Sequence, residues 1–256
     1  MSTIIVRSAE SVHWYRKDGT PQYTVKGKNG QDRPTTLRDA RALNLVPSVT
    51  TILKVMAKPG LEQWKLEQML LAALTLPRDP AESETDYIQR IVHDSKESAR
   101  TAADKGTYIH ESIESHLAGK TTPVEHRSTV TAFHEEISAY FNVPFDYPWI
   151  VEAAFASPLG FGGKVDIHST KVPIVIDTKT KDFGPDDKVD AYDEHLMQLA
   201  AYRHGLEMPE ARCANVFVSR THPGVIRIVE WNPGDLERGW EMFKHLLEFW
   251  KLKNCL

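Results

Sequence analysis

The sequence predicts an α/β fold in which a mixed central β-sheet is flanked by helices, with a largely helical N-terminal half. Five short runs rich in Val, Ile and Phe lie between residues 149 and 231 and are bounded by turn residues. Helical periodicity dominates from 59 to 141, and helical segments follow the third and fifth runs. Helices around a cluster of strands are typical of α/β architecture. We expect one domain over residues 1–256, with a helical part at 1–145 and the sheet with its helices at 146–256.

The N-terminal part is expected to begin with a β-hairpin. Residues 12–33 contain aromatic and β-branched runs separated by Asp18-Gly19, and Asn29-Gly30 closes the second run. Pro47 and Ser48 are helix-starting residues. The predicted helices of this part span residues 35–44, 47–56, 59–76, 83–103, 105–120 and 124–141.

The C-terminal part is expected to supply the sheet. Its three consecutive strands are predicted at 149–156, 162–168 and 173–180, and a long helix at 187–206 follows them. Two more strands, at 212–219 and 225–231, precede an amphipathic helix from Pro233 to Lys253.

Composition excludes several classes of protein. A net charge of −4 argues against a strongly basic nucleic-acid coat protein, although it leaves room for a nucleic-acid enzyme with a local cationic site. Two cysteines, Cys213 and Cys255, cannot form a four-thiolate zinc site or hold an iron–sulfur cluster, and they suit a reducing compartment. The first residues lack a secretory signal pattern, and no run is apolar enough to span a bilayer. We therefore expect a cytoplasmic protein of a bacterial or phage-infected cell, without a membrane partner.

The stretch GFGGKVDIHSTKVPIVIDTKTKDFG, residues 160–184, places charged residues inside two apolar strands. Side chains alternate along a strand, so Asp177 and Lys179 share a face, about 7 Å apart. A turn near Thr170 would fold the strands together and bring Asp166 opposite a position of the same parity as Asp177. Two carboxylates would then be able to share a divalent cation beside an ammonium group. The competing interpretation is a solvated strand face, on which such pairs contribute little.

The helix after these strands carries polar residues at helical spacing. His195, Gln198 and Tyr202 lie at i, i+3 and i+7 and share one face, with Gln198 and Tyr202 one turn apart. The competing interpretation is a helix that packs on the sheet through Leu196 and Leu199 and uses these polar groups for nothing else.

In this order, Gly163-x-x-Asp166, Asp177-Thr178-Lys179 and Gln198-x-x-x-Tyr202 resemble the motifs of the RecB-like branch of the PD-(D/E)XK nucleases. KGTYIHESIESHL resembles the Gly-Thr-x-x-His helix of that branch, with His110 as the matching histidine. PSVTTILKVMAKPGLEQWK is similar to the N-terminal part of its phage-type and mitochondrial-type exonucleases. The resemblance runs from about residue 47 to 206 and implies a restriction-endonuclease-like fold.

The resemblance also implies roles for single residues. His110, Asp166 and Asp177, together with the Thr178 carbonyl, would hold Mg²⁺ or Mn²⁺. Lys179 would be the catalytic lysine, and Gln198 and Tyr202 would orient the site and the DNA. Glu152 on the preceding strand and Glu114 on the histidine helix are further candidate acids, although both types of position are commonly exposed. The chain lacks the four cysteines of the iron–sulfur members of this branch, so no cluster is expected.

The expected activity is a metal-dependent DNA exonuclease of replication, recombination or repair, acting on single-stranded ends, with a recombination or replication protein as partner and with phage origin as one source. The alternatives are a structure-specific or flap endonuclease and a non-catalytic DNA-binding module on the same fold. Basic and aromatic side chains of the N-terminal hairpin are candidate contacts to single-stranded DNA, or else a solvated edge. These residues are Trp14, Tyr15, Arg16, Lys17, Tyr23, Lys26, Lys28 and Arg33.

Overall fold

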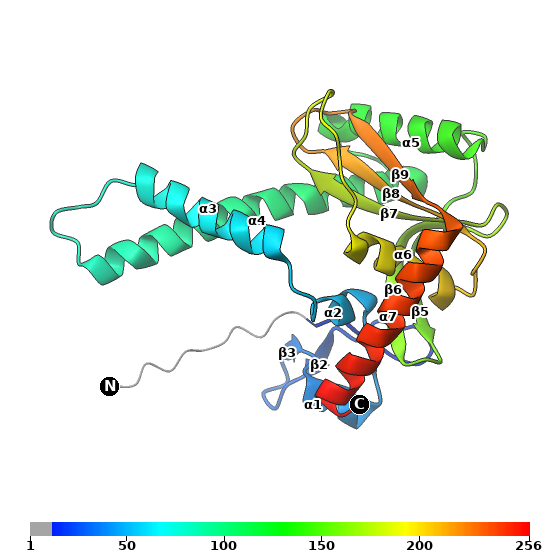
Figure 1. The fold of residues 1–256 in the computed structure, drawn as a ribbon, viewed down its shortest axis with the longest axis horizontal. Coiled ribbons are helices and arrows are strands. Elements are labelled where there is room, and N and C mark those ends of the chain that lie inside the picture. Colours follow the sequence, from blue (N-terminus) through cyan, green and yellow to red (C-terminus); the bar gives the residue numbers. More distant parts are fainter. Residues whose placement is uncertain (1–11) are drawn as a thin grey trace.

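The computed structural model describes residues 12–256, except for the side chains of residues 98 and 99. Its centre is a five-stranded mixed sheet in the order β5-β6-β7-β8-β9 (Figure 1). The β7–β8 pair is parallel and the other neighbours are antiparallel. The strands are β5 (Ile150–Ser157), β6 (Phe161–Ser169), β7 (Ile174–Lys181), β8 (Arg212–Ser219) and β9 (Ile226–Trp231). Each predicted strand is confirmed to within one residue at both ends.

Helices cover both faces of the sheet and bury its apolar side chains. On one face, α6 (Asp193–Gly205) and α7 (Pro233–Asn254) pack on Val165, Val175 and Cys213. On the other, α5 (Arg127–Phe141), preceded by the short η1 (Val124–His126), packs with the end of α4 on Ile167, Ile174 and Ile176. The predicted α/β class with a mixed sheet is thus confirmed. The helix predicted at 187–206 begins later, at Asp193, because residues 185–192 form a loop.

The N-terminal segment differs from the single hairpin that the sequence predicted. Strand β1 (Trp14–Tyr15) pairs with β4 (Val46–Pro47), and a separate hairpin joins β2 (Thr24–Lys26) to β3 (Asp32–Pro34). Trp14 is 1% exposed and Tyr15 is 2% exposed. Their rings belong to the core rather than to a DNA-stacking surface, because β1 pairs with β4 and Trp14 packs against Trp250. Two short helices, α1 (Leu37–Leu43) and α2 (Val49–Leu53), complete this part.

One long helix replaces two predicted ones. Helix α4 runs unbroken from Glu84 to Leu117, where the sequence suggested a break before Gly106. Gly106 does not end the helix. It lets α4 pack closely on β7, where a Cβ at this position would collide with the Thr180 hydroxyl. The first half of α4 projects from the body beside α3 (Pro59–Thr75), as Figure 1 shows. The second half crosses the sheet.

Within residues 12–256, no helix is both long enough and apolar enough to cross a membrane. Residues 1–11 lie outside the described range. They include part of the N-terminal segment for which the sequence predicted no secretory signal.

Candidate active site

The site begins where strands β6 and β7 part. Their ladder ends at the pair Ile167–Ile176, and the next residues along the two strands are Asp166 and Asp177. The register therefore places the two aspartates opposite each other, a closer pairing than the shared strand face that the sequence predicted. Because the strands separate here, the backbone groups of Thr178 are free to bond with side chains rather than with β6.

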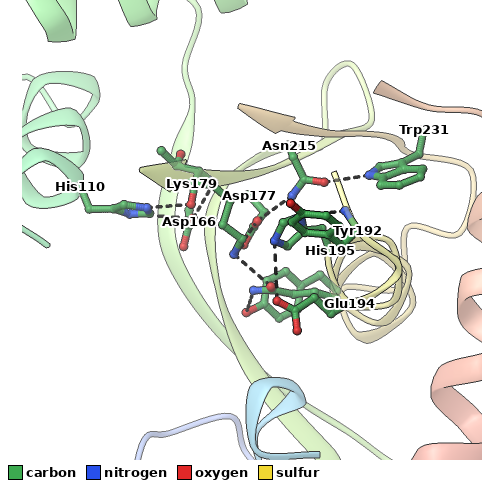
Figure 2. Close-up of polar contacts among 12 residues, drawn as sticks. His110, Asp166, Asp177, Lys179, Tyr192, Glu194, His195, Asn215 and Trp231 are labelled. Atoms are coloured by element: carbon green, nitrogen blue, oxygen red, sulfur yellow. Dashed lines mark hydrogen bonds and ion pairs between the residues drawn. The ribbon is translucent and has the colours of Figure 1, made fainter. Parts of the chain in front are cut away.

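Two side chains take over the bonds that the ladder leaves unmade. The Thr178 amide donates to Asp166 Oδ2 at 2.8 Å, and His110 Nε2 lies 2.8 Å from the Thr178 carbonyl oxygen. A carbonyl oxygen only accepts, so His110 carries its proton on Nε2. Helix α4 can bring His110 this close because Gly106, one turn earlier, lets it approach β7. Figure 2 shows His110 reaching the strands from its own side of the site.

Asp177 is almost fully buried and held on both oxygens. Lys179 Nζ lies 2.9 Å from Oδ1 and 2.8 Å from Oδ2, and Asn215 Nδ2 donates to Oδ2 at 2.8 Å. Asn215 faces Asp177 directly in the parallel β7–β8 register. It also accepts a 2.8 Å hydrogen bond from Trp231 Nε1 (Figure 2). The sequence analysis missed Asn215 and Trp231. The one available signal was a polar residue in the middle of the apolar run CANVFV.

Helix α6 closes the site from the side of Asp177. Lys179 Nζ donates to Gln198 Oε1 at 3.1 Å, and Gln198 Nε2 donates to the Tyr202 hydroxyl at 3.0 Å. Gly163 makes room for the Tyr202 ring at the end of this series of hydrogen bonds, because a Cβ at that position would lie 2.9 Å from Tyr202 Cε1. His195 does not join it: the ring nitrogen Nδ1 accepts from the Tyr192 amide at 3.2 Å and caps the helix.

The charges at the site are concentrated and partly unbalanced. Burial and the negative charge of Asp177 raise the pKa of Asp166 to about 6. Burial lowers the pKa of Lys179, but the two carboxylates outweigh it and raise that pKa above its ordinary value, so the ammonium stays charged. Burial also lowers the pKa of His110, and here Glu114 and Asp166 outweigh it and raise that pKa. Burial and the charges of the two aspartates hold the Tyr202 hydroxyl protonated, with its pKa well above normal.

Glu152 marks a distortion next to Asp166. It has a φ of 57° in the middle of β5, and it is the one β5 position without a partner between the pairs Val151–Ile167 and Ala153–Val165. Val165 and Ile167 are two residues apart on β6 and would share one face of a regular strand. They pack instead in the core clusters on opposite faces of the sheet, so the regular alternation of β6 is broken at Asp166. The Glu152 carboxylate forms an ion pair with Lys164. Such strain is concentrated at functional sites.

A cavity of about 660 Å³ opens over these residues, within the range of about 300–1,000 Å³ usual for ligand sites. One wall is α4, including Gly106, His110 and Glu114. Tyr23 also lines the cavity, and its ring stacks on that of His13 with ring centroids 4.6 Å apart. The predicted residues Glu152, Asp166, Asp177, Thr178, Lys179, Gln198 and Tyr202 also line it, and so do Ser48, Thr50, Lys164 and Thr180, which the sequence analysis did not select.

The predicted hairpin contacts do not gather at this cavity. Of that group, Tyr15 and Tyr23 line it, and Tyr15 offers only an edge because it is buried. Arg16, Lys17, Lys26 and Lys28 are exposed but do not line it. Lys26 pairs with Asp32 and Arg33 pairs with Asp39, so two of the five predicted cationic side chains are neutralised by a neighbouring carboxylate. Of the predicted hairpin residues, only Tyr23 therefore presents an accessible ring at the cavity, where it stacks on His13.

The donor chemistry around Asp166 fits a hard divalent cation. Carboxylates, a backbone carbonyl and an imidazole converge, with His110 Nδ1 lying 3.7 Å from Glu114 Oε1 and 3.9 Å from Asp166 Oδ2. Asp177 is buried and the adjacent Asp166 is partly buried with a raised pKa, so a positive charge placed between the two carboxylates would reduce their mutual repulsion. Among residues 12–256, no three His, Cys, Asp or Glu side chains are already spaced as a metal centre, and Lys179 and Asn215 occupy both oxygens of Asp177.

No family model matches the chain. No curated protein matches it either. Among solved structures, the crystal structure of SSO0001 is similar at 15% identity over 73% of this chain and 86% of that one, with a TM-score of 0.29. A likeness at that level carries no argument about function.

Proposed function

We propose that this protein is a divalent-metal-dependent DNA exonuclease that hydrolyses phosphodiester bonds at ends of single-stranded DNA, in replication, recombination or repair. The observation that carries the proposal is the meeting of His110, Asp166, Asp177, Lys179 and Gln198 in one cavity. They come from α4, β6, β7 and α6, so their convergence is a property of the fold rather than of one segment.

We assign the metal to Asp166, Asp177, His110 and the Thr178 carbonyl, with Glu114 as an additional acid beside His110. When bound, Mg²⁺ or Mn²⁺ would lower the pKa of a water molecule and offset charge on the phosphate. Asn215 keeps the Asp177 carboxylate oriented through its 2.8 Å hydrogen bond. Glu152 is held by Lys164, which makes it a weaker candidate ligand than the sequence suggested.

The contacts of Lys179 favour one of its roles. Its Nζ donates to Asp177 and Gln198, and an ammonium donor held in this way can also donate a hydrogen bond to a phosphate oxygen. Gln198 fixes its position through the 3.1 Å hydrogen bond, and Tyr202 fixes Gln198 in turn. In this proposal Lys179 stabilises the charge that develops on the phosphate, and Gln198 and Tyr202 aim it.

The walls of the cavity favour a single strand over a duplex. Helix α4 lies close across β7, and the Tyr23–His13 stack also borders the cavity. An aromatic face beside the cavity can stack any base, which suits degradation without sequence preference.

The test compares linear with circular single-stranded DNA at equal nucleotide concentration, with Mg²⁺, with Mn²⁺ and with EDTA. We expect metal-dependent loss of the linear DNA and survival of the circle. Rapid nicking of the circle would instead support the endonuclease. Asp177→Asn should abolish cleavage, while Asp190→Asn, in the exposed loop before α6, should leave it unchanged. A wild-type protein that binds DNA and cleaves neither form would be a binding module.

His110→Ala separates a metal ligand from a structural residue. Loss of the ligand should raise the Mn²⁺ concentration needed for half-maximal activity. A lowered melting temperature with an unchanged Mn²⁺ requirement would mean that His110 serves the fold alone.

A further inference from the structure

Lys181 lies beside the candidate active site and carries no counter-ion. It follows Lys179 by two residues on β7, so the two side chains share one strand face about 7 Å apart. Lys179 is held by Asp177 at 2.8 Å, whereas no carboxylate in the described part of the chain forms an ion pair with Lys181. The next residue, Asp182, pairs with Arg220 instead. The charge of Lys181 is therefore available to a ligand.

Tyr192 presents an aromatic ring at the same place. The Lys181 ammonium lies 6.0 Å from the centroid of that ring, within the range of a cation–π contact. The Tyr192 amide donates to His195 Nδ1 at 3.2 Å, so its backbone is tied to α6, the helix that carries Gln198. Tyr192 is nevertheless 55% exposed. A ring that is fixed at its base and open over half its surface is able to stack on a nucleobase.

A second cavity, of about 480 Å³, adjoins this ring. Its apolar lining comes from three side chains besides Tyr192, namely Met56, Pro59 and Leu61. Two carboxylates also line it, and each is paired with a cation. Glu194 pairs with Lys58 at 2.7 Å, and Asp193 pairs with Arg238 at 3.4 Å. An apolar space whose acids are offset by neighbouring cations fits a nucleobase better than a phosphate.

We propose that Lys181 and Tyr192 form a second nucleotide subsite, in which Lys181 binds the phosphate next to the one that is cleaved and Tyr192 stacks on the base of that nucleotide. The spacing of Lys179 and Lys181 along the strand is close to the distance between successive phosphates of an extended single strand. One aromatic ring stacks on any base, so the subsite holds the strand without sequence preference. This inference rests on the proposed nuclease function, because it assigns a part of the substrate path.

The salt dependence of DNA binding tests the phosphate contact. Binding of the full chain to a fluorescent dT oligomer of about twelve nucleotides is measured by anisotropy in EDTA, so that the strand is not cleaved, from about 50 to 200 mM salt. Each phosphate contact on a single strand contributes about 0.7 to the steepness of log K against log salt, and Lys181→Ala should lower the steepness by about that amount. Lys171→Ala, in the exposed turn at the opposite end of β7, is the matched control and should leave it unchanged.

An abasic strand of the same length separates the base contact from the phosphate contact. Tyr192→Leu should weaken binding to the dT oligomer about tenfold and should bind the abasic strand like the wild type, because that strand has no base to stack. Tyr192→Phe keeps the ring and should bind both strands like the wild type. Lys181→Ala should weaken binding to both strands. Circular dichroism checks that each variant keeps the wild-type helix content and melting temperature.

The outcomes distinguish the subsite from the nuclease proposal. A wild type that binds neither the dT strand nor the abasic strand would remove the DNA substrate itself, and the subsite with it. A wild type that binds the dT strand, together with an unchanged salt dependence for Lys181→Ala, would overturn the phosphate contact alone. Equal losses of Tyr192→Leu on the dT and abasic strands would mean that Tyr192 acts through the fold, and would overturn the stacking.

Discussion

Replacing Asn215 by alanine separates orientation of Asp177 from stability of the fold. The change removes the 2.8 Å donor to Asp177 Oδ2 and the acceptor of Trp231 Nε1. A hydrogen bond to a charged group contributes about 1.5–3 kcal/mol. Because Lys179 still contacts the same oxygen at 2.8 Å, the carboxylate is not left unpaired, and we expect the lower end, about 1–2 kcal/mol of unfolding free energy.

The effect on metal binding should be larger than the effect on stability. Lys179 is a flexible donor that follows the carboxylate, whereas Asn215 sits on a neighbouring strand and fixes it. Loss of such a partner typically weakens metal binding about 10–100-fold. Isothermal titration of the DNA-free protein with Mn²⁺ measures this directly, and urea unfolding of the metal-free protein measures stability. Trp231→Phe removes only the hydrogen bond from Trp231 to Asn215 and leaves the bond from Asn215 to Asp177 in place. It should therefore weaken Mn²⁺ binding less than Asn215→Ala does.

Ser219→Ala is the matched control, because Ser219 is also buried on β8 and donates to the Phe183 carbonyl at 2.6 Å. It should cost similar stability and no Mn²⁺ affinity. If Asn215→Ala lowers stability but binds Mn²⁺ like the wild type, Asn215 has no positioning role. If the wild type itself takes up no Mn²⁺, the metal assignment fails first.

Three further outcomes are expected. Lys179→Ala should slow single-turnover cleavage at saturating DNA by orders of magnitude while changing DNA affinity little; unchanged cleavage with lost binding would make the lysine a phosphate clamp only. Gly163→Ala should lower the cleavage rate by displacing the Phe155 and Tyr202 rings, which a Cβ would approach to 2.8 and 2.9 Å. Because part of that loss acts through Tyr202, combining it with Tyr202→Ala should cost less than the sum of the two single losses, and full additivity would contradict this coupling. Burial raises the pKa of Cys213 to about 12, whereas Cys255 is exposed. One thiol per native chain should therefore react with a disulfide reagent at pH 8, and two should react after unfolding. Two fast-reacting thiols in the native protein would contradict the burial of Cys213.

Local pattern and turn chemistry determined much of this protein. Alternation and β-branched content located all five strands of the sheet, and the short turn after Ser169 set the register that brings Asp166 opposite Asp177. Helical spacing correctly grouped Gln198 with Tyr202. These features depend on neighbours within a few residues or on one hairpin, so sequence alone carries them.

Tertiary structure decided the rest, because those features depend on what lies far away in the chain. Asn215 reaches Asp177 through a parallel pairing that follows a whole intervening helix, and no local pattern specifies such a partner. Gly106 permits a close crossing over Thr180 where its sequence suggested a break. Trp14 and Tyr15 were expected at a surface, but β4 and the core cover them. For Trp14 and Tyr15, long-range packing overrode the local pattern, because the free energy gained by burying a large side chain exceeds the small energies that set local propensity.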